Sequence, residues 1–73
     1  MKACEIKEGG VYRNRGKGKT ARRVIAIGNE HKPDHWFSDS PPPNEPGVLY
    51  ADQKGRHERL YLSSFAAWSG SEL

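Results

Sequence analysis

The first third of the chain carries a run of basic side chains that could bind an anion. Six of them lie between positions 13 and 23 with no acidic residue among them: Arg13, Arg15, Lys17, Lys19, Arg22 and Arg23. Gly16 and Gly18 interrupt the run, and an aliphatic segment at residues 24–27 follows it. This order is typical of a cationic loop held by a rigid strand, and such a loop can meet phosphate groups or an acidic protein surface. The six residues are therefore candidate ligand-binding residues.

Residues 16–20, Gly-Lys-Gly-Lys-Thr, invite comparison with the phosphate-binding P-loop of nucleotide hydrolases. The spacing does not fit, because that pattern would need glycine at position 13, where the chain has Arg13. The context does not fit either, since a P-loop leads into a helix whose amides hold phosphate, whereas Thr20 leads into a segment that favours a strand. The segment therefore predicts an anion-binding loop without nucleotide hydrolysis.

Histidines and carboxylates form no recognisable catalytic or metal motif. His31 and His35 are four residues apart, but Pro33 between them disfavours the helix that would bring both to one metal ion. No nucleophile is paired with a base in a known arrangement, so we expect no enzyme activity, no metal and no cofactor. His35 and the adjacent Trp36 could instead line a pocket for a flat ring whose phosphate meets the basic loop, and both are candidate ligand-binding residues.

Three tyrosines could add base stacking to the basic loop. Tyr12, Tyr50 and Tyr61 all lie in segments that favour strands. In small β-barrels that bind nucleic acid, bases stack on such rings while Arg and Lys meet the phosphates, and Tyr12 joins the candidate ligand-binding residues on this ground. Two alternatives remain open at this point: the tyrosines could be half-buried strand residues, and the basic run could be only a solvated loop.

Length and charge predict a single small domain, residues 1–73, with a cationic face. A chain of 73 residues buries only about 60% of the surface that its unfolded form exposes, so its core must be minimal and a homodimer is possible. The net charge of +3 divides into +6 over residues 1–28, −3 over residues 29–50 and 0 over residues 51–73. The positive field therefore belongs to the N-terminal third.

Cysteine content and hydropathy indicate the compartment. No segment approaches the roughly 20 apolar residues of a membrane span, and the N-terminus lacks the apolar run of a signal peptide. The single cysteine, Cys4, allows no intramolecular disulfide and fits a reducing compartment. We therefore expect a cytoplasmic protein with no membrane partner, and we expect Cys4 to be a small buried residue of a first strand.

Sequence patterns predict four short strands, at residues 11–13, 21–27, 48–51 and 59–62. The second has the densest β-branched content, and its alternation sends Arg22 and Arg23 to opposite faces. A turn that contains Gly55 joins the last two strands as an antiparallel pair. After them, Ser63 or Ser64 can cap a single helical turn that carries Phe65 and Trp68 on one side.

A long connection at residues 29–47 separates the second and third strands. Three consecutive prolines at residues 41–43 make its second part extended and non-helical. Trp36 and Phe37 indicate that part of it packs against the core, or that it exposes them for binding. These elements together predict an all-β fold: a small SH3-like antiparallel barrel of four to five strands with a long inserted loop and a C-terminal helical turn.

Three segments resemble small uncharacterised proteins encoded by phages and prophages. They are Gly-Val-Tyr-Arg-Asn-Arg at residues 10–15, Arg-Arg-Val-Ile-Ala-Ile at residues 22–27 and Leu-Ser-Ser-Phe-Ala-Ala-Trp at residues 62–68. The shared layout is a glycine-tyrosine opening strand, a basic turn, an aliphatic strand and a closing Ser-x-Phe-Ala-x-Trp segment. The resemblance implies an SH3-like barrel and a phage setting, and it carries no catalytic signature.

Two functions fit these observations. In the first, a non-enzymatic protein binds nucleic acid or a nucleotide through its basic loop with aromatic help. In the second, a phage accessory protein docks on a host defence protein through residues 31–46 and inhibits it. Both would act in the host cytoplasm.

Overall fold

The computed structural model describes residues 1–34, 36 and 39–73. These residues form five strands: β1 (Val11–Asn14), β2 (Ala21–Gly28), β3 (Gly47–Ala51), β4 (His57–Tyr61) and β5 (Ser69–Glu72). The helix α1 (Leu62–Trp68) and two short 3₁₀ turns, η1 (Ala3–Glu5) and η2 (Asn29–His31), complete the fold. Among the described helices, none combines the length and the apolar character that a membrane crossing requires.

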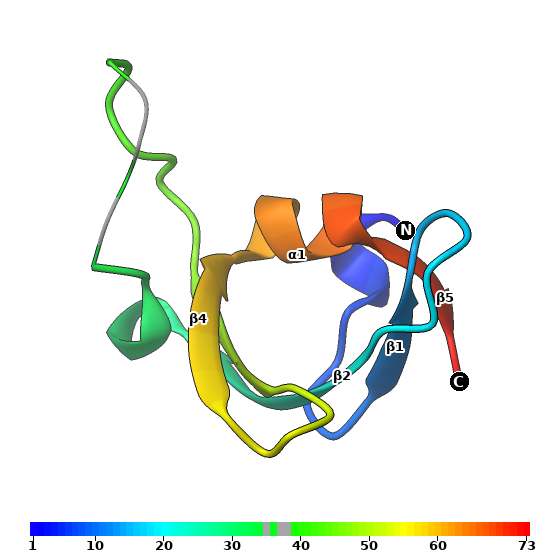
Figure 1. Cartoon of the computed structure of the whole chain (residues 1–73). Helices are drawn as coiled ribbons and strands as arrows, with labels where there is room; N and C mark the ends of the chain where they lie inside the picture. Colours follow the sequence, from blue (N-terminus) through cyan, green and yellow to red (C-terminus); the bar gives the residue numbers. More distant parts are fainter. Residues whose placement is uncertain (35, 37–38) are drawn as a thin grey trace.

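The strands form one antiparallel sheet in the order β4-β3-β2-β1-β5. The sheet curls but stays open, with β4 and β5 as its two edges, and α1 lies across the space between those edges (Figure 1). The prediction of a small, mostly antiparallel β fold is confirmed. All four predicted strands form within a few residues of their expected positions.

No sequence pattern places the fifth strand, β5. Its sequence, Ser-Gly-Ser-Glu, contains no β-branched or aromatic residue. The strand forms because β1 offers it an unpaired edge, where Tyr12 pairs with Glu72 and Arg13 with Ser71. Pairing with a neighbour thus overrides a weak intrinsic preference.

The predicted cap of the helix is wrong. We expected Ser63 or Ser64 to cap a single turn, but α1 has seven residues and Tyr61 precedes it without a side-chain cap. The helix begins at Leu62, whose N–H donates to the Pro46 carbonyl at 3.1 Å and so continues the β3–β4 pairing into the first residue of α1. Ser63 therefore lies within the first turn, where its backbone N–H donates to the Glu45 carboxylate at 3.0 Å and its hydroxyl donates to the same oxygen.

This carboxylate gives a testable contribution to stability. Glu45→Gln should lower the free energy of unfolding by about 1 kcal/mol, because the negative charge at the positive end of the helix is lost. Urea denaturation followed by circular dichroism measures the change. Asp39→Asn, which removes an exposed negative charge from the same connection, is the control. Equal effects of the two substitutions would show that only the net charge of the connection matters.

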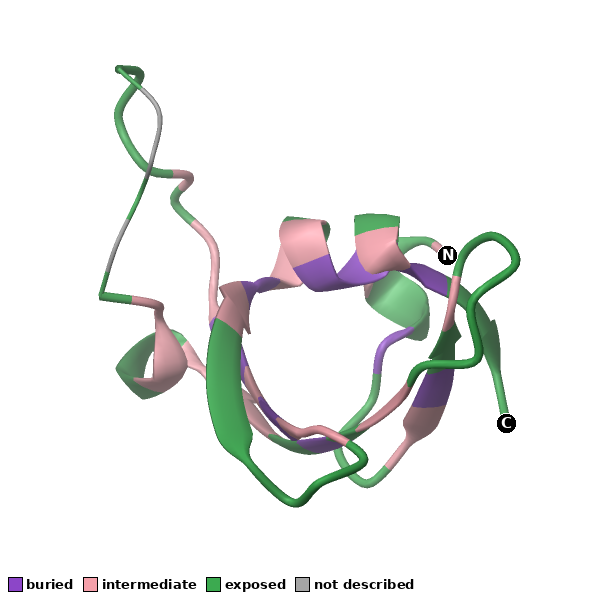
Figure 2. Cartoon of the chain, in the orientation of Figure 1, coloured by how far each residue is buried: buried purple, intermediate pink, exposed green. Residues whose placement is uncertain are grey.

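The core is centred on Phe65 of α1. Its side chain is 0% exposed, and its ring centroid lies 5.8 Å from that of Tyr12, 5.4 Å from that of Tyr50 and 5.3 Å from that of Trp68. The inner face of the sheet, the underside of α1 and the residue that follows η1 supply the buried positions (Figure 2). They are Ile6, Tyr12, Val24, Val48, Tyr50, Phe65 and Ala66.

One sequence-based expectation about burial is wrong: Cys4 is exposed and lies in η1 instead of a strand, while Ile6, two residues later, is buried. Of the two alternatives for Trp36, the structure favours exposure, since this residue is 40% exposed. Its neighbour Phe37 falls outside the described residues.

The two ends of the long connection meet at Gly47. A Cβ atom at this position would lie 2.0 Å from the carbonyl oxygen of His31 and 2.4 Å from the backbone nitrogen of Lys32. No side chain fits so close an approach of two backbones, so the position requires glycine. The start of β3 is thereby held against the end of η2.

Candidate functional site

The β1–β2 hairpin that carries the basic run is fastened at its base to two other parts of the fold. Its own ends are joined by Asn14 N–H to the Thr20 carbonyl at 3.0 Å and by Thr20 N–H to the Asn14 side-chain oxygen at 3.1 Å. Arg15 N–H donates to the carbonyl of Trp68 in α1 at 2.7 Å. The Gln53 amide donates to the Lys19 carbonyl at 3.0 Å. The hairpin thus projects from a fixed base formed by α1 and the β3–β4 turn.

Five of the predicted ligand-binding cations are exposed on this hairpin: Arg13, Arg15, Lys17, Lys19 and Arg23. The two ion pairs found within the described part of the chain, His31 with Glu30 and Arg56 with Asp52, involve none of them. The five exposed cations of this one hairpin therefore have no ion-pair partner among the described residues, and we call them the hairpin cations.

Arg22 lies on the opposite face of β2 from Arg23, as the alternation predicts. Its guanidinium carbon lies 4.7 Å from the ring centroid of Tyr50 and 4.2 Å from that of Trp68, which is cation–π geometry. Burial raises the pKa of the Tyr50 phenol, and the positive charge of Arg22 opposes that rise. Because its guanidinium already packs against two rings, the structure separates Arg22 from the hairpin cations.

The predicted stacking role of Tyr12 is wrong. The side chain is 0% exposed, and its hydroxyl accepts a hydrogen bond from Lys7 N–H at 2.7 Å and donates to the Glu5 carbonyl at 3.2 Å. Tyr50 and Tyr61 are also buried. The physical reason is size: so small a core depends on its large aromatic rings, and strand alternation turns these rings inward. No tyrosine can therefore stack on a base in this fold.

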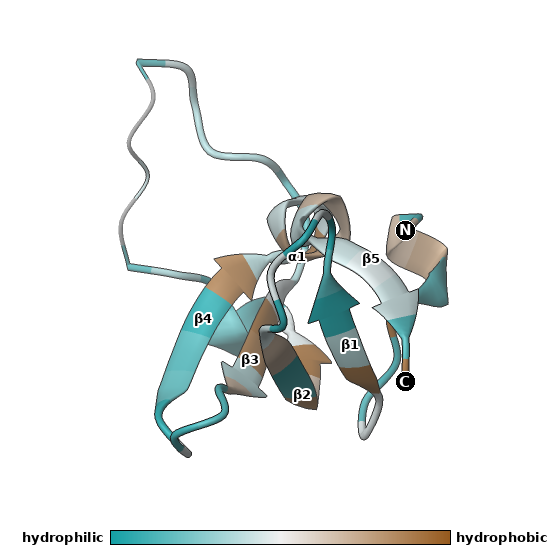
Figure 3. Ribbon diagram, turned by 45° about the vertical axis from the view of Figure 1, so that its right-hand side comes forward, coloured by the Kyte–Doolittle hydropathy of each residue, from teal (hydrophilic) through white to brown (hydrophobic). Residues whose placement is uncertain are grey.

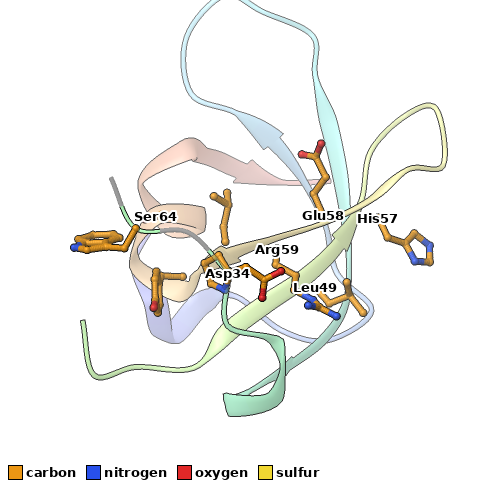
Figure 4. Close-up of a pocket in the computed structure, with 10 residues that line it drawn as sticks. Asp34, Leu49, His57, Glu58, Arg59 and Ser64 are labelled. Carbon is orange, nitrogen blue, oxygen red and sulfur yellow. The ribbon is translucent and has the colours of Figure 1, made fainter. Parts of the chain in front are cut away.

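The remaining two predicted site residues lie away from the hairpin. His35 falls outside the described residues. The Trp36 ring packs edge-on against Tyr61 with a centroid separation of 5.5 Å, and its indole N–H donates to the Ser40 carbonyl at 2.9 Å. The long connection that carries Trp36 and the β1–β2 hairpin lie at opposite ends of α1 (Figure 1). Trp36 therefore does not extend the hairpin surface, and it lines instead a hollow of about 850 Å³ beside β4 (Figure 4).

The β3–β4 turn contributes a further exposed cation, Lys54, next to the residue that is bonded to the hairpin, and the sequence did not predict this contribution. Asp52 in this turn has a pKa below its ordinary value, chiefly because Arg56 N–H donates to its carboxylate at 2.9 Å, helped by Lys54 N–H at 2.8 Å and by the Arg56 guanidinium. The negative charge of Asp52 is thus bound by hydrogen-bond donors of the same turn. Lys54 is exposed beside Gln53, the residue bonded to the hairpin. No signal in the sequence links these two turns, which are neighbours only in the folded sheet.

Within the described residues, no group of three or more His, Cys, Asp and Glu side chains gathers to hold a metal ion. In comparisons with known proteins, the chain matches no family model, and neither a curated protein nor a solved structure is significantly similar to it. The resemblance to phage-encoded proteins thus stays a prediction.

Proposed function

We propose that the protein binds the phosphate backbone of nucleic acid through the hairpin cations. The observation that carries this proposal is that five exposed cations on one anchored hairpin have no ion-pair partner among the described residues. Like charges held so close together repel one another, and a polyanion removes that repulsion while releasing its own counterions. A mobile tail could spread its charges apart, but this hairpin is fixed at its base.

The buried tyrosines narrow the proposed mode of binding. Recognition of a free nucleotide or of a splayed base needs an aromatic surface beside the cations, and no exposed ring lies on the hairpin. Contacts to the backbone need only positive charge and hydrogen-bond donors. The proposed ligand is therefore a nucleic acid strand or duplex, bound with little dependence on base sequence.

The proposal includes a finer description of the fold and its setting. The strand order β4-β3-β2-β1-β5, with a helix between β4 and β5, supports an SH3-like barrel whose seam is covered by that helix. The sequence resemblance adds a phage or prophage origin, in which the protein would act in the cytoplasm of the host.

Binding to duplex DNA should weaken steeply as salt is added. Neutralising three to five phosphates gives a slope of about −2.7 to −4.5 in a plot of log affinity against log salt concentration, so a fourfold rise in NaCl should weaken binding by about 40- to 500-fold. Fluorescence anisotropy with a labelled duplex, repeated at several NaCl concentrations, measures the slope. Salt-independent affinity, or no binding to either DNA or RNA at low salt, would contradict the proposal.

A further inference from the structure

β4 is an edge strand that lies along a hollow. It pairs with β3 on one side only. All five of its residues line the hollow, together with Trp36 and Pro33 from the long connection (Figure 4). Successive side chains of a strand point to opposite faces of the sheet, so a hollow lined by consecutive residues of β4 reaches the edge of this strand. The hollow also extends over the sheet face that carries Leu49 of β3.

The pairing register identifies the backbone groups that face this edge. Asp52 N–H donates to the Arg56 carbonyl, and Leu62 N–H donates to the Pro46 carbonyl, so the even-numbered residues of this stretch bond toward β3. In an antiparallel pair the intervening residues direct their N–H and C=O groups the other way. His57 and Arg59 therefore direct both of their backbone groups toward this edge, and Tyr61 directs its N–H there, because its carbonyl, at the N-cap of α1, accepts the first hydrogen bond of the helix.

We propose that this edge binds an extended peptide segment of a partner protein as an added antiparallel strand. The segment carries an acidic side chain opposite Arg59 and an apolar side chain opposite Tyr61. The proposal is independent of nucleic-acid binding, because β4 and the basic hairpin lie on different sides of the fold (Figure 1). Pro33, Asp34 and Trp36, which belong to the segment expected from the sequence to be a docking element, form one wall of the groove.

The side chains along the groove specify the chemistry of the peptide. At one end, the exposed Trp36 ring packs on Tyr61 beside Pro33 and Leu60, which favours an apolar residue. In the middle, Arg59 is exposed and forms no ion pair with a described residue, which favours a carboxylate opposite it. Asp34 and Glu58 also line the hollow, which favours a cation next to that carboxylate in the peptide. The exposed part of β4 is strongly hydrophilic, in keeping with a strand that is solvated until a partner covers it (Figure 3).

A second copy of this chain would meet like-charge repulsion at this edge in two registers of the pairing. In a symmetric dimer, two β4 strands would pair antiparallel across a two-fold axis perpendicular to the sheet. The residue at this axis would lie directly opposite the same residue of the other copy. Centring this pairing on Glu58 opposes two carboxylates, and centring it on Arg59 opposes two guanidinium groups. Like charges directly opposite each other destabilise a strand pair. A peptide from a different protein avoids this repulsion.

Titration of the ¹⁵N-labelled protein with two blocked peptides tests the proposal. The first peptide has a central sequence of two valines followed by Glu, Lys and Thr, and the second exchanges Glu and Lys. We expect the first to shift the amide resonances of His57, Arg59 and Tyr61 and to bind more tightly. Arg59→Glu should weaken the first peptide about fivefold and strengthen the second by a similar factor. Lys7→Glu, which makes the same change of charge at an exposed side chain outside the groove, should leave both affinities unchanged.

Methylating the backbone nitrogen of the peptide residue opposite Arg59 should weaken binding at least tenfold, because the strand pairing loses a central hydrogen bond. Arg59→Gln, a milder change, should weaken the first peptide about twofold and provides a variant if Arg59→Glu does not fold. Unchanged β4 resonances with both peptides, or equal binding of the methylated peptide, would overturn the proposal. A concentration-dependent dimer that Arg59→Glu abolishes would overturn it in favour of a second copy. None of these results bears on the salt dependence of DNA binding.

Discussion

Replacing Phe65 with alanine should lower the free energy of unfolding by about 4 kcal/mol. The ring is fully buried and contacts Tyr12, Tyr50 and Trp68, so its removal leaves a cavity at the point where α1 meets the sheet. A domain of 73 residues has a total stability of only about 4 to 11 kcal/mol. The substitution should therefore remove between about a third and all of the stability of the domain.

Urea denaturation followed by tryptophan fluorescence and by circular dichroism measures this loss. Phe65→Leu, which keeps most of the volume, should cost less than half as much. Ile25→Ala removes an aliphatic side chain that is 40% exposed and should cost under about 1 kcal/mol. If Phe65→Ala were no more harmful than Ile25→Ala, then α1 would not be part of the core.

Replacing all five hairpin cations with glutamine should weaken DNA binding at low salt by at least a hundredfold and bring the salt slope close to zero. The residues are exposed and make no ion pair with described residues, so the fold should be retained. Anisotropy titrations of wild type and variant on the same duplex give both quantities.

A second variant with the same net charge separates local from overall electrostatics. It replaces five cations outside the hairpin with glutamine: Lys2, Lys7, Lys32, Arg56 and Arg59. This control should retain most of the affinity and most of the salt slope. Equal losses in the two variants would mean that the net charge of the protein, and no particular surface, attracts DNA. Arg22→Gln should chiefly lower stability, because Arg22 packs on two aromatic rings.

The sequence predicted the elements whose signal is local. The β-branched residues of β2 and the alternation of Arg22 and Arg23 are properties of one segment, and the structure places both arginines as expected. The exposed, basic hairpin also follows from its glycines and its charge. Such features need no knowledge of neighbouring strands.

The missed features all depend on partners that are distant in sequence. β5 needs the edge of β1, and the first turn of α1 needs the carboxylate of Glu45. The sequence suggested base stacking for Tyr12 because basic residues surround it. In the structure its ring lies on the face of β1 that packs against the core, and it is 0% exposed. The contact of Gln53 with the Lys19 carbonyl likewise joins two turns that the chain order keeps apart.

The close approach at Gly47 has a consequence for how this fold can change. His31 and Gly47 hold the two ends of the long connection against each other, and this closure involves only their backbones and that of Lys32. Doubling the length of such a closed segment costs only about 0.6 kcal/mol of chain entropy. Provided that Glu45 and Pro46 keep their bonds to α1, an unrelated sequence can be grafted into this segment. The scaffold can thus acquire new specificities at one site while its strands stay unchanged.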